Sequence, residues 1–132
     1  MPRPAADLLT EREAQLMDVI WTLGEGTADQ IRQNLTEELH DSTVRTQLRI
    51  LESKGYVTHV TRGKSYVYRP AVPRVEAQRS AVRSFLSRLF SGSAEDLVLR
   101  LLEEEVLTPQ QLEEIQQSIR PRRSRRSSGG ST

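Results

Sequence analysis

The 132-residue chain contains no cysteine, and aromatic residues make up only 5% of it. Without thiols, disulfides, thiolate catalysis and cysteine-based zinc or copper sites are excluded, so packing alone has to stabilise the fold. No uninterrupted apolar run approaches the roughly 18 residues needed to cross a bilayer, and the first residues lack the apolar core of a signal peptide. We therefore expect a cytoplasmic protein that does not contact a membrane.

The common catalytic motifs are missing as well. The sequence has no G-x-S-x-G elbow, no Walker loop and no H-E-x-x-H helix. His40 and His59 are too far from each other in the sequence to suggest a metal site. Positions in a loop and on a strand surface explain them better. We expect no enzyme activity, no cofactor and no metal.

Charge is unevenly distributed along the chain, although the formal net charge is only +1. Residues 7–40 hold two arginines and eight acids, whereas residues 41–74 hold seven lysines and arginines and only two acids. Residues 75–120 are acidic again, with five arginines and eight acids. A basic segment between acidic ones is typical of a protein with one face that attracts a polyanion such as nucleic acid.

Three helices are predicted in the first half of the chain. The segments TERE and TADQ each place a Thr three residues before a Glu or Gln, which is the spacing of a capping box at a helix start. A third helix is expected to begin at Asp41 or Ser42, whose side chains can cap free backbone amides, and to end near Lys54. Its residues Val44 and Leu48 lie on the face that is expected to be buried.

A β-hairpin is predicted after the third helix. The runs YVTHV and SYVYR are rich in β-branched and aromatic residues and flank the turn TRGK. Three helices followed by a hairpin is the order of a winged helix-turn-helix, in which the third helix enters the major groove of DNA. We therefore expect a mainly α fold with a small β-hairpin and a winged-helix domain over residues 8–72.

The side of the third helix that faces away from the predicted core is polar and basic. Arginine can bond guanine through two hydrogen bonds, and threonine can contact thymine methyls or phosphates. The hairpin tip and the end of the third helix carry further cations that are placed to bind phosphates. The predicted DNA-binding residues are Ser42, Thr43, Arg45, Thr46, Arg49, Lys54, Arg62 and Lys64.

Other interpretations of the same residues remain open. A row of Arg and Thr can be a solvated helix face, and a winged helix can serve as a protein-interaction module without sequence-specific DNA binding. A regulator that senses a small molecule is a third possibility. The charge asymmetry and the cationic hairpin tip favour DNA binding. Tyr66 and Tyr68 could stack on bases, but cross-strand packing is the more common role of alternating strand aromatics.

A helical dimerisation region is predicted over residues 73–120. Ser93 and Thr108 are placed to cap two of its three helices, and Pro109 suits a first helical position. The apolar faces of these helices are larger than so short a segment can bury on itself, so a second copy is expected to cover them. The residues assigned to this role are Val82, Phe85, Leu86, Leu89, Leu101, Leu102, Leu112, Ile115 and Ile119.

Both ends of the chain are predicted to be flexible. The first seven residues form a loose N-terminus, and residues 121–132 contain only Arg, Ser, Gly, Pro and Thr. This basic tail could add phosphate contacts, but a solvated end without a role in binding is favoured.

Short motifs follow one another along the chain in a recognisable order: Trp21, Thr43-x-Arg45-Thr46, Tyr66-x-Tyr68, Phe85-Leu86 and Leu97-Val98-Leu99. With these motifs, the chain resembles the BlaI/MecI/CopY family of bacterial repressors over about residues 8–119. The resemblance implies a homodimeric winged-helix repressor that binds a palindromic operator and controls genes for β-lactam resistance, copper export or another stress response.

The chain departs from the family pattern where the family receives its signals. Penicillinase-type members are inactivated when a sensor protease cuts an Asn-Phe bond in the fifth helix, and Arg100-Leu101 stands at the matching position. Copper-responsive members carry a pair of Cys-x-Cys motifs near the C-terminus, and this chain has no cysteine. The resemblance therefore assigns neither an inducer nor a sensor protease to this chain.

Overall fold

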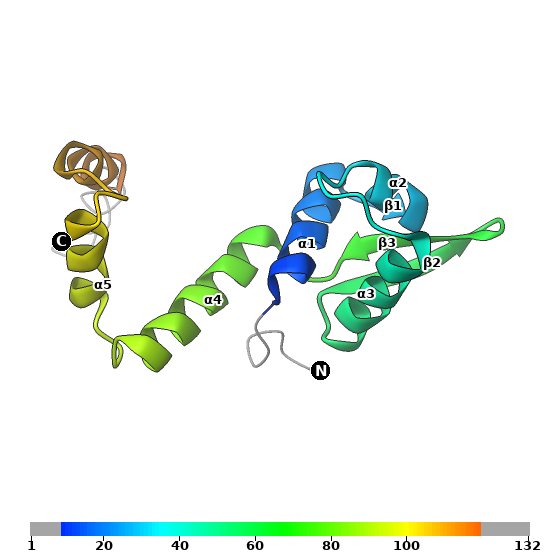
Figure 1. The fold of residues 1–132 in the computed structure, drawn as a ribbon, viewed down its shortest axis with the longest axis horizontal. Coiled ribbons are helices and arrows are strands. Elements are labelled where there is room, and N and C mark those ends of the chain that lie inside the picture. The colour runs from blue at the N-terminus through cyan, green and yellow to red at the C-terminus, as the bar shows by residue number, and fades with distance from the viewer. Residues whose placement is uncertain (1–8, 120–132) are drawn as a thin grey trace, which may run out of the picture. The chain divides into compact units, whose positions relative to one another are not determined.

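The computed structural model describes residues 9–119, so the predicted flexible ends lie outside the described residues. The chain divides into two compact units after Ser84. The first unit contains three helices and a small antiparallel sheet with the strand order β1-β3-β2 (Figure 1). Its elements are α1 (Glu11–Leu23), β1 (Gly26–Thr27), α2 (Ala28–Gln33), α3 (Asp41–Ser53), β2 (Val57–Arg62) and β3 (Ser65–Pro70). This is the predicted winged-helix order.

The first two helices begin as the sequence predicts. The Thr10 hydroxyl accepts a hydrogen bond from the backbone N–H of Glu13 at 3.1 Å, and the Glu13 carboxylate accepts one from the N–H of Thr10 at 2.8 Å. Thr27 and Gln30 form the same reciprocal pair, at 3.1 and 2.9 Å. Both capping boxes are confirmed, and each satisfies two backbone donors that the first helical turn leaves free.

Two details of the first unit differ from the prediction. Neither Asp41 nor Ser42 caps α3, because His40 is the N-cap residue and no side chain accepts a bond there. β1 was not predicted, since two residues are too few to show an alternating pattern. It pairs with β3 through Gly26 opposite Tyr68 and Thr27 opposite Val67.

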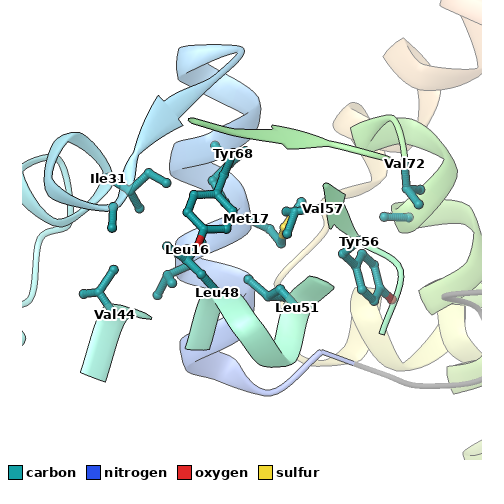
Figure 2. Close-up of a cluster of buried hydrophobic side chains, with 13 residues drawn as sticks. Leu16, Met17, Ile31, Val44, Leu48, Leu51, Tyr56, Val57, Tyr68 and Val72 are labelled. Atoms are coloured by element: carbon teal, nitrogen blue, oxygen red, sulfur yellow. The ribbon is translucent and has the colours of Figure 1, made fainter. Parts of the chain in front are cut away.

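The core of the first unit lies between the three helices and the sheet (Figure 2). Each apolar side chain of this size contributes about 1.5–3 kcal/mol when it is fully buried. Because the buried side chains of α3 point into this core, the rotation of α3 about its axis is fixed. Fully buried side chains come from α1, α2, α3 and β2: Leu16, Met17, Ile20, Ile31, Val44, Leu48, Leu51 and Val57.

A partly buried ion pair ties α1 to the end of α3. The Lys54 ammonium lies 2.8 Å from the Glu13 carboxylate, whose side chain is only 4% exposed. Burial acts to raise the pKa of Glu13, but the hydrogen bonds from Lys54 and Thr10 outweigh it, and the pKa lies below its ordinary value. Glu13 is therefore a structural residue as well as a capping one.

Helix α4 (Arg74–Leu89) begins in the first unit and ends in the second, which also contains α5 (Ala94–Glu103) and a helical segment over residues 109–119. The predicted caps are confirmed, since Ser93 accepts from the N–H of Asp96 at 3.1 Å and Thr108 accepts from that of Gln111 at 3.1 Å. Within residues 85–119 not one residue is fully buried. In a single copy, the described part of this unit therefore has no closed core.

Candidate DNA-binding surface

The outward face of α3 is polar and accessible. Val44, Leu48 and Leu51 have no exposed surface, so the residues between them are turned away from the core. Ser42, Arg45, Thr46 and Arg49 are exposed and Thr43 is half-buried. The structure thus brings five of the eight predicted DNA-binding residues together on one side of one helix.

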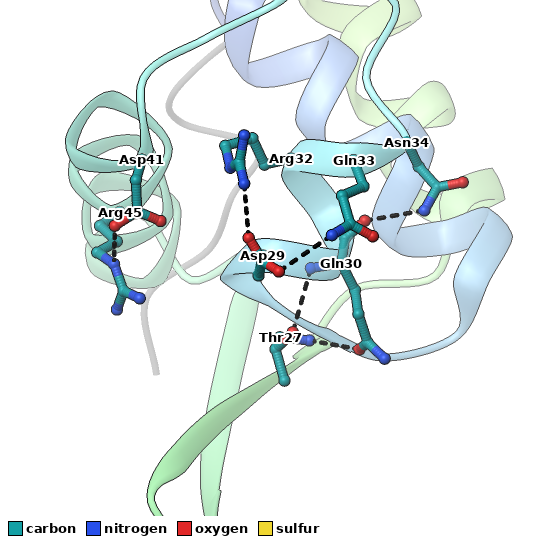
Figure 3. A network of polar contacts seen from close by, with 8 residues as sticks. All are labelled: Thr27, Asp29, Gln30, Arg32, Gln33, Asn34, Asp41 and Arg45. Atoms are coloured by element: carbon teal, nitrogen blue, oxygen red, sulfur yellow. Dashed lines mark hydrogen bonds and ion pairs between the residues drawn. The ribbon is translucent and has the colours of Figure 1, made fainter.

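Arg45 is held by an acid on the same helix. Its Nε lies 2.8 Å from the Asp41 carboxylate, one helical turn earlier, and both side chains are more than half exposed (Figure 3). The hydrogen bond and the charge of Asp41 raise the pKa of Arg45, which stays a cation at all accessible pH values. On the facing helix α2, Asp29 binds Arg32 at 2.7 Å and Gln33 at 3.1 Å.

The hairpin places a cationic tip beyond the helices of the first unit (Figure 1). Arg62 pairs with Ser65, which leaves Gly63 and Lys64 as a two-residue loop. Gly63 has φ 61°, a left-handed conformation that favours glycine, and Lys64 is exposed. The Lys64 ammonium forms no ion pair with another described residue.

The Arg62 guanidinium forms an ion pair with an acid and is not free in solvent. Its Nη1 is 2.7 Å from the Glu25 carboxylate, which also lies 3.0 Å from the Nε of Arg69. Hydrogen bonding from Arg62 is the main cause that lowers the pKa of Glu25, and Arg69 adds to it. One carboxylate in the turn between α1 and β1 therefore binds two arginines of the hairpin.

A hollow of about 290 Å³ joins α3 to the hairpin. Arg45 lines it from the helix, and Lys64 and Tyr66 line it from the hairpin. The remaining lining residues are Thr27, Ala28, Asp29, Ser65 and Tyr68. Two predicted DNA-binding segments that are separate in the sequence thus border one concave surface.

Aromatic residues of the hairpin pack on each other, as predicted. His59 stacks on Tyr66 with ring centroids 4.2 Å apart and lies 5.7 Å from Tyr68 across the strands. The Nδ1 of His59 also lies 2.8 Å from the carboxylate of Glu52 on α3. Tyr68 is nearly buried, and burial raises its pKa. These contacts anchor the hairpin against α3.

Lys54 is the predicted DNA-binding residue whose placement differs most from expectation. Its ammonium binds Glu13 and its side chain is only 22% exposed, because the end of α3 turns toward α1. Contact between Lys54 and a phosphate remains a prediction, and it would have to compete with this ion pair.

Arg69 and the acids Asp41 and Glu25 are parts of the surface that sequence reasoning missed. The sequence did contain a signal for Arg69. Strand alternation puts Arg69 on the same sheet face as Ser65, and Ser65 is the cross-strand partner of Arg62, so both arginines lie on one face. Asp41 also gave a signal, since it stands four residues before Arg45 on the predicted helix. Glu25 gave none, because it is distant in sequence from the hairpin.

Among residues 9–119 no three His, Cys, Asp or Glu side chains gather as a metal site would require. No helix in that part of the chain is long and apolar enough to cross a membrane.

The fold is that of a winged-helix protein, and its candidate surface is of the kind that binds DNA. The family model described as penicillinase repressor matches residues 9–121, and the chain belongs to this family of BlaI/MecI-type repressors. It is accordingly a transcriptional repressor with DNA as its partner, and not an enzyme.

Two relatives illustrate the likeness. The chain is 26% identical over 120 residues to the penicillinase repressor of Bacillus licheniformis, covering 89% of this chain and 94% of the relative. It is 23% identical over 109 residues to the methicillin resistance regulatory protein MecI of Staphylococcus aureus strain N315, covering 81% of this chain and 89% of the relative.

Among solved structures, TrmBL2, an archaeal chromatin protein, overlays with a TM-score of 0.46 and 20% identity. The match covers 86% of this chain but only 37% of TrmBL2.

Proposed function

We propose that the repressor is a homodimer that occupies a palindromic operator and leaves it in response to a stress signal. The observation that carries the proposal is the placement of the exposed α3 face and the cationic hairpin tip around one hollow. In this arrangement α3 enters the major groove, while the hairpin lies along the neighbouring phosphates.

The residues divide by role. Arg45 and Arg49 are one helical turn apart and reach guanine edges, and Thr43 and Thr46 contact thymine methyls or phosphates. Ser42 lies at the start of the helix, where a hydroxyl suits a phosphate oxygen. Lys64 and Arg62 bind phosphates from the hairpin, and Lys54 adds a contact only if it leaves Glu13.

Dimerisation is supported by the exposed apolar side chains after residue 81. Val82, Phe85 and Leu89 on α4 are 50%, 42% and 69% exposed, and Ile115 and Ile119 are 45% and 43% exposed. The half-buried members of the predicted set lie beside them: Leu86, Leu101, Leu102 and Leu112. A second copy would complete the core that a single copy lacks.

A symmetric dimer reads a symmetric site. Two recognition helices related by a two-fold axis contact half-sites one turn of DNA apart, about 34 Å, or a multiple of it. Relatives of the chain are named for penicillinase and methicillin resistance, and control of a β-lactam response is the corresponding proposal for the regulated genes.

The test is fluorescence anisotropy of the purified full chain on the DNA upstream of its own gene, with a shuffled duplex for comparison, over a series of salt concentrations. Tight binding that requires both half-sites of a palindrome and falls steeply with salt is the expected result. If the upstream duplex binds as weakly as the shuffled one, a selection from genomic DNA decides between another operator and a protein-interaction module.

A further inference from the structure

The cations of the DNA-binding surface are of two kinds. Arg45 is bound to Asp41 at 2.8 Å, and Arg62 and Arg69 are bound to Glu25 at 2.7 and 3.0 Å. By contrast, Arg49 and Lys64 are exposed and form no ion pair with another described residue. The unpaired cations can bind a phosphate directly, whereas the paired arginines first have to break their ion pair with a carboxylate.

The ion pairs of these acids contribute little to folding, although Asp41 also lies in the first turn of α3, where a carboxylate favours the helix dipole. The side chains of the Asp41–Arg45 pair are 53% and 58% exposed, and the Glu25 side chain is 40% exposed. Pairs as exposed as these contribute little to stability, because water and salt screen them and both side chains lose freedom. A carboxylate beside a surface that binds phosphate also weakens binding of any DNA. We therefore expect the larger effect of these ion pairs on DNA binding, and only a small one on the stability of the fold.

We propose that Asp41 and Glu25 are specificity-determining positioning residues, which restrain Arg45, Arg62 and Arg69 so that DNA other than the operator is bound weakly. The inference rests on the proposed operator binding. Specificity is a difference between two affinities, and it can be raised by weakening the wrong complex.

The restraint acts differently on the two kinds of DNA. On a non-operator duplex, paired guanine acceptors do not stand in register with Arg45 and the other contacts of α3, so nothing compensates for the loss of Asp41 and the ion pair persists. On the operator, two hydrogen bonds to guanine replace the bond to Asp41. The hairpin arginines leave Glu25 only when α3 is seated and the hairpin lies along the backbone.

Two variants test the proposal, Asp41→Asn and Glu25→Gln, each of which keeps the size of the side chain and removes its charge. The probes are a duplex selected from random-sequence DNA by the wild-type chain and a shuffled duplex of the same composition. Each variant should bind the shuffled duplex about two- to fivefold more tightly at low salt, the factor expected for release of an exposed ion pair. The selected duplex should gain less, so the affinity ratio falls.

The salt dependence gives a second readout. A cation that leaves its carboxylate and binds a phosphate steepens the slope of log affinity against log salt by about 0.9. We expect this change on the shuffled duplex for Asp41→Asn, and up to twice as large a change for Glu25→Gln, which releases two arginines.

Two control variants separate the loss of a particular ion pair from the general effect of removing one negative charge. Asp18→Asn removes the same unit of charge from an exposed pair with Arg74, at 2.9 Å, which involves no predicted DNA-binding residue. It should change the affinity ratio and the slope less than either test variant. Asp41→Glu keeps an acid four residues before Arg45 and should retain the wild-type ratio. Circular dichroism melting verifies that each variant is folded.

The outcomes for the inference and for the proposed function can be told apart. If wild type prefers the selected duplex but Asp41→Asn and Glu25→Gln leave the shuffled-duplex affinity and the ratio unchanged, the inference is wrong and operator binding stands. If no duplex can be selected over shuffled DNA by the wild type, operator binding itself fails and the inference fails with it.

Discussion

At the residue scale, the roles proposed for Arg45 and Lys64 differ in kind. Arg45 is assigned to base edges, so Arg45→Ala should weaken operator binding about tenfold and affect shuffled DNA much less. Lys64→Ala should weaken binding to both duplexes alike and lower the salt slope by about one unit. Anisotropy titrations of both variants on both duplexes check this division. Equal losses on the two duplexes for both variants would contradict it.

Glu13 links stability to pH. Its pKa is lower in the folded chain than in the unfolded chain, so its stabilising effect is complete above the ordinary carboxyl pKa of about 4.3 and is lost as pH falls through the lowered folded value. Glu13→Gln should cost about 2 kcal/mol at neutral pH, because a charged hydrogen-bond partner of Lys54 is lost. Below the folded pKa the wild type should approach the variant.

Urea unfolding of wild type and Glu13→Gln at several pH values measures this effect. The control is Glu37→Gln, which removes an exposed acid paired with Arg12 at 3.3 Å and should cost less than about 0.5 kcal/mol. A constant difference between wild type and Glu13→Gln at all pH values would rule out the linkage.

At the element scale, helix starts and the hairpin could be predicted, while pairings over longer distances could not. A capping box places Thr and Glu or Gln three residues apart, so the starts of α1 and α2 follow from local sequence. β1 is two residues long and exists only because β3 offers a free edge. The contact of Glu25 with the hairpin likewise forms only after the chain has folded back on itself. No pattern in the sequence around Glu25 therefore predicts it.

The outward face of α3 was predictable for a physical reason. Apolar residues at helical spacing decide which side is buried, so the remaining polar positions are known to face away. The same argument fails at Lys54. This residue caps the end of α3, so the helical period does not determine where its side chain points. The argument also fails for the N-cap, because Asp41 lies one position inside the helix and binds Arg45 instead.

The hairpin loop allows a test of one element. Gly63 has φ 61° and an added Cβ would meet nothing within 4 Å, so Gly63→Ala costs only backbone strain, roughly 1 kcal/mol. Lys64→Ala is the matched control, since φ at Lys64 is not positive, and stability should change by less than about 0.5 kcal/mol. Thermal unfolding measures both. Equal melting temperatures for the two variants would contradict the strain argument.

At the scale of the whole molecule, the proposed dimer rests on the exposed apolar side chains of α4 and of the second unit. Leu89 is 69% exposed in one chain, so Leu89→Asp should leave the single copy folded but shift the proposed dimer toward monomer. Because a monomer contacts one half-site only, operator affinity should fall as the fraction of dimer falls. Sedimentation equilibrium measures the association.

A matched variant controls for a new charge on an exposed apolar position. Val106 is 70% exposed and lies outside the predicted dimerisation residues, so Val106→Asp should keep the association constant of the wild type. If Leu89→Asp associates as strongly as Val106→Asp, Leu89 does not lie in the dimer interface.

The contacts of Trp21 give the molecule an optical reporter. It is the single tryptophan of the chain, its indole N–H donates to the carbonyl of Val72 at 2.8 Å, and the guanidinium of Arg74 lies 5.5 Å from its ring. Its emission therefore reports on the junction between α1 and the start of α4 within the first unit. Far-ultraviolet dichroism records the helices of both units, so a difference between the two melting curves would reveal whether the units unfold separately.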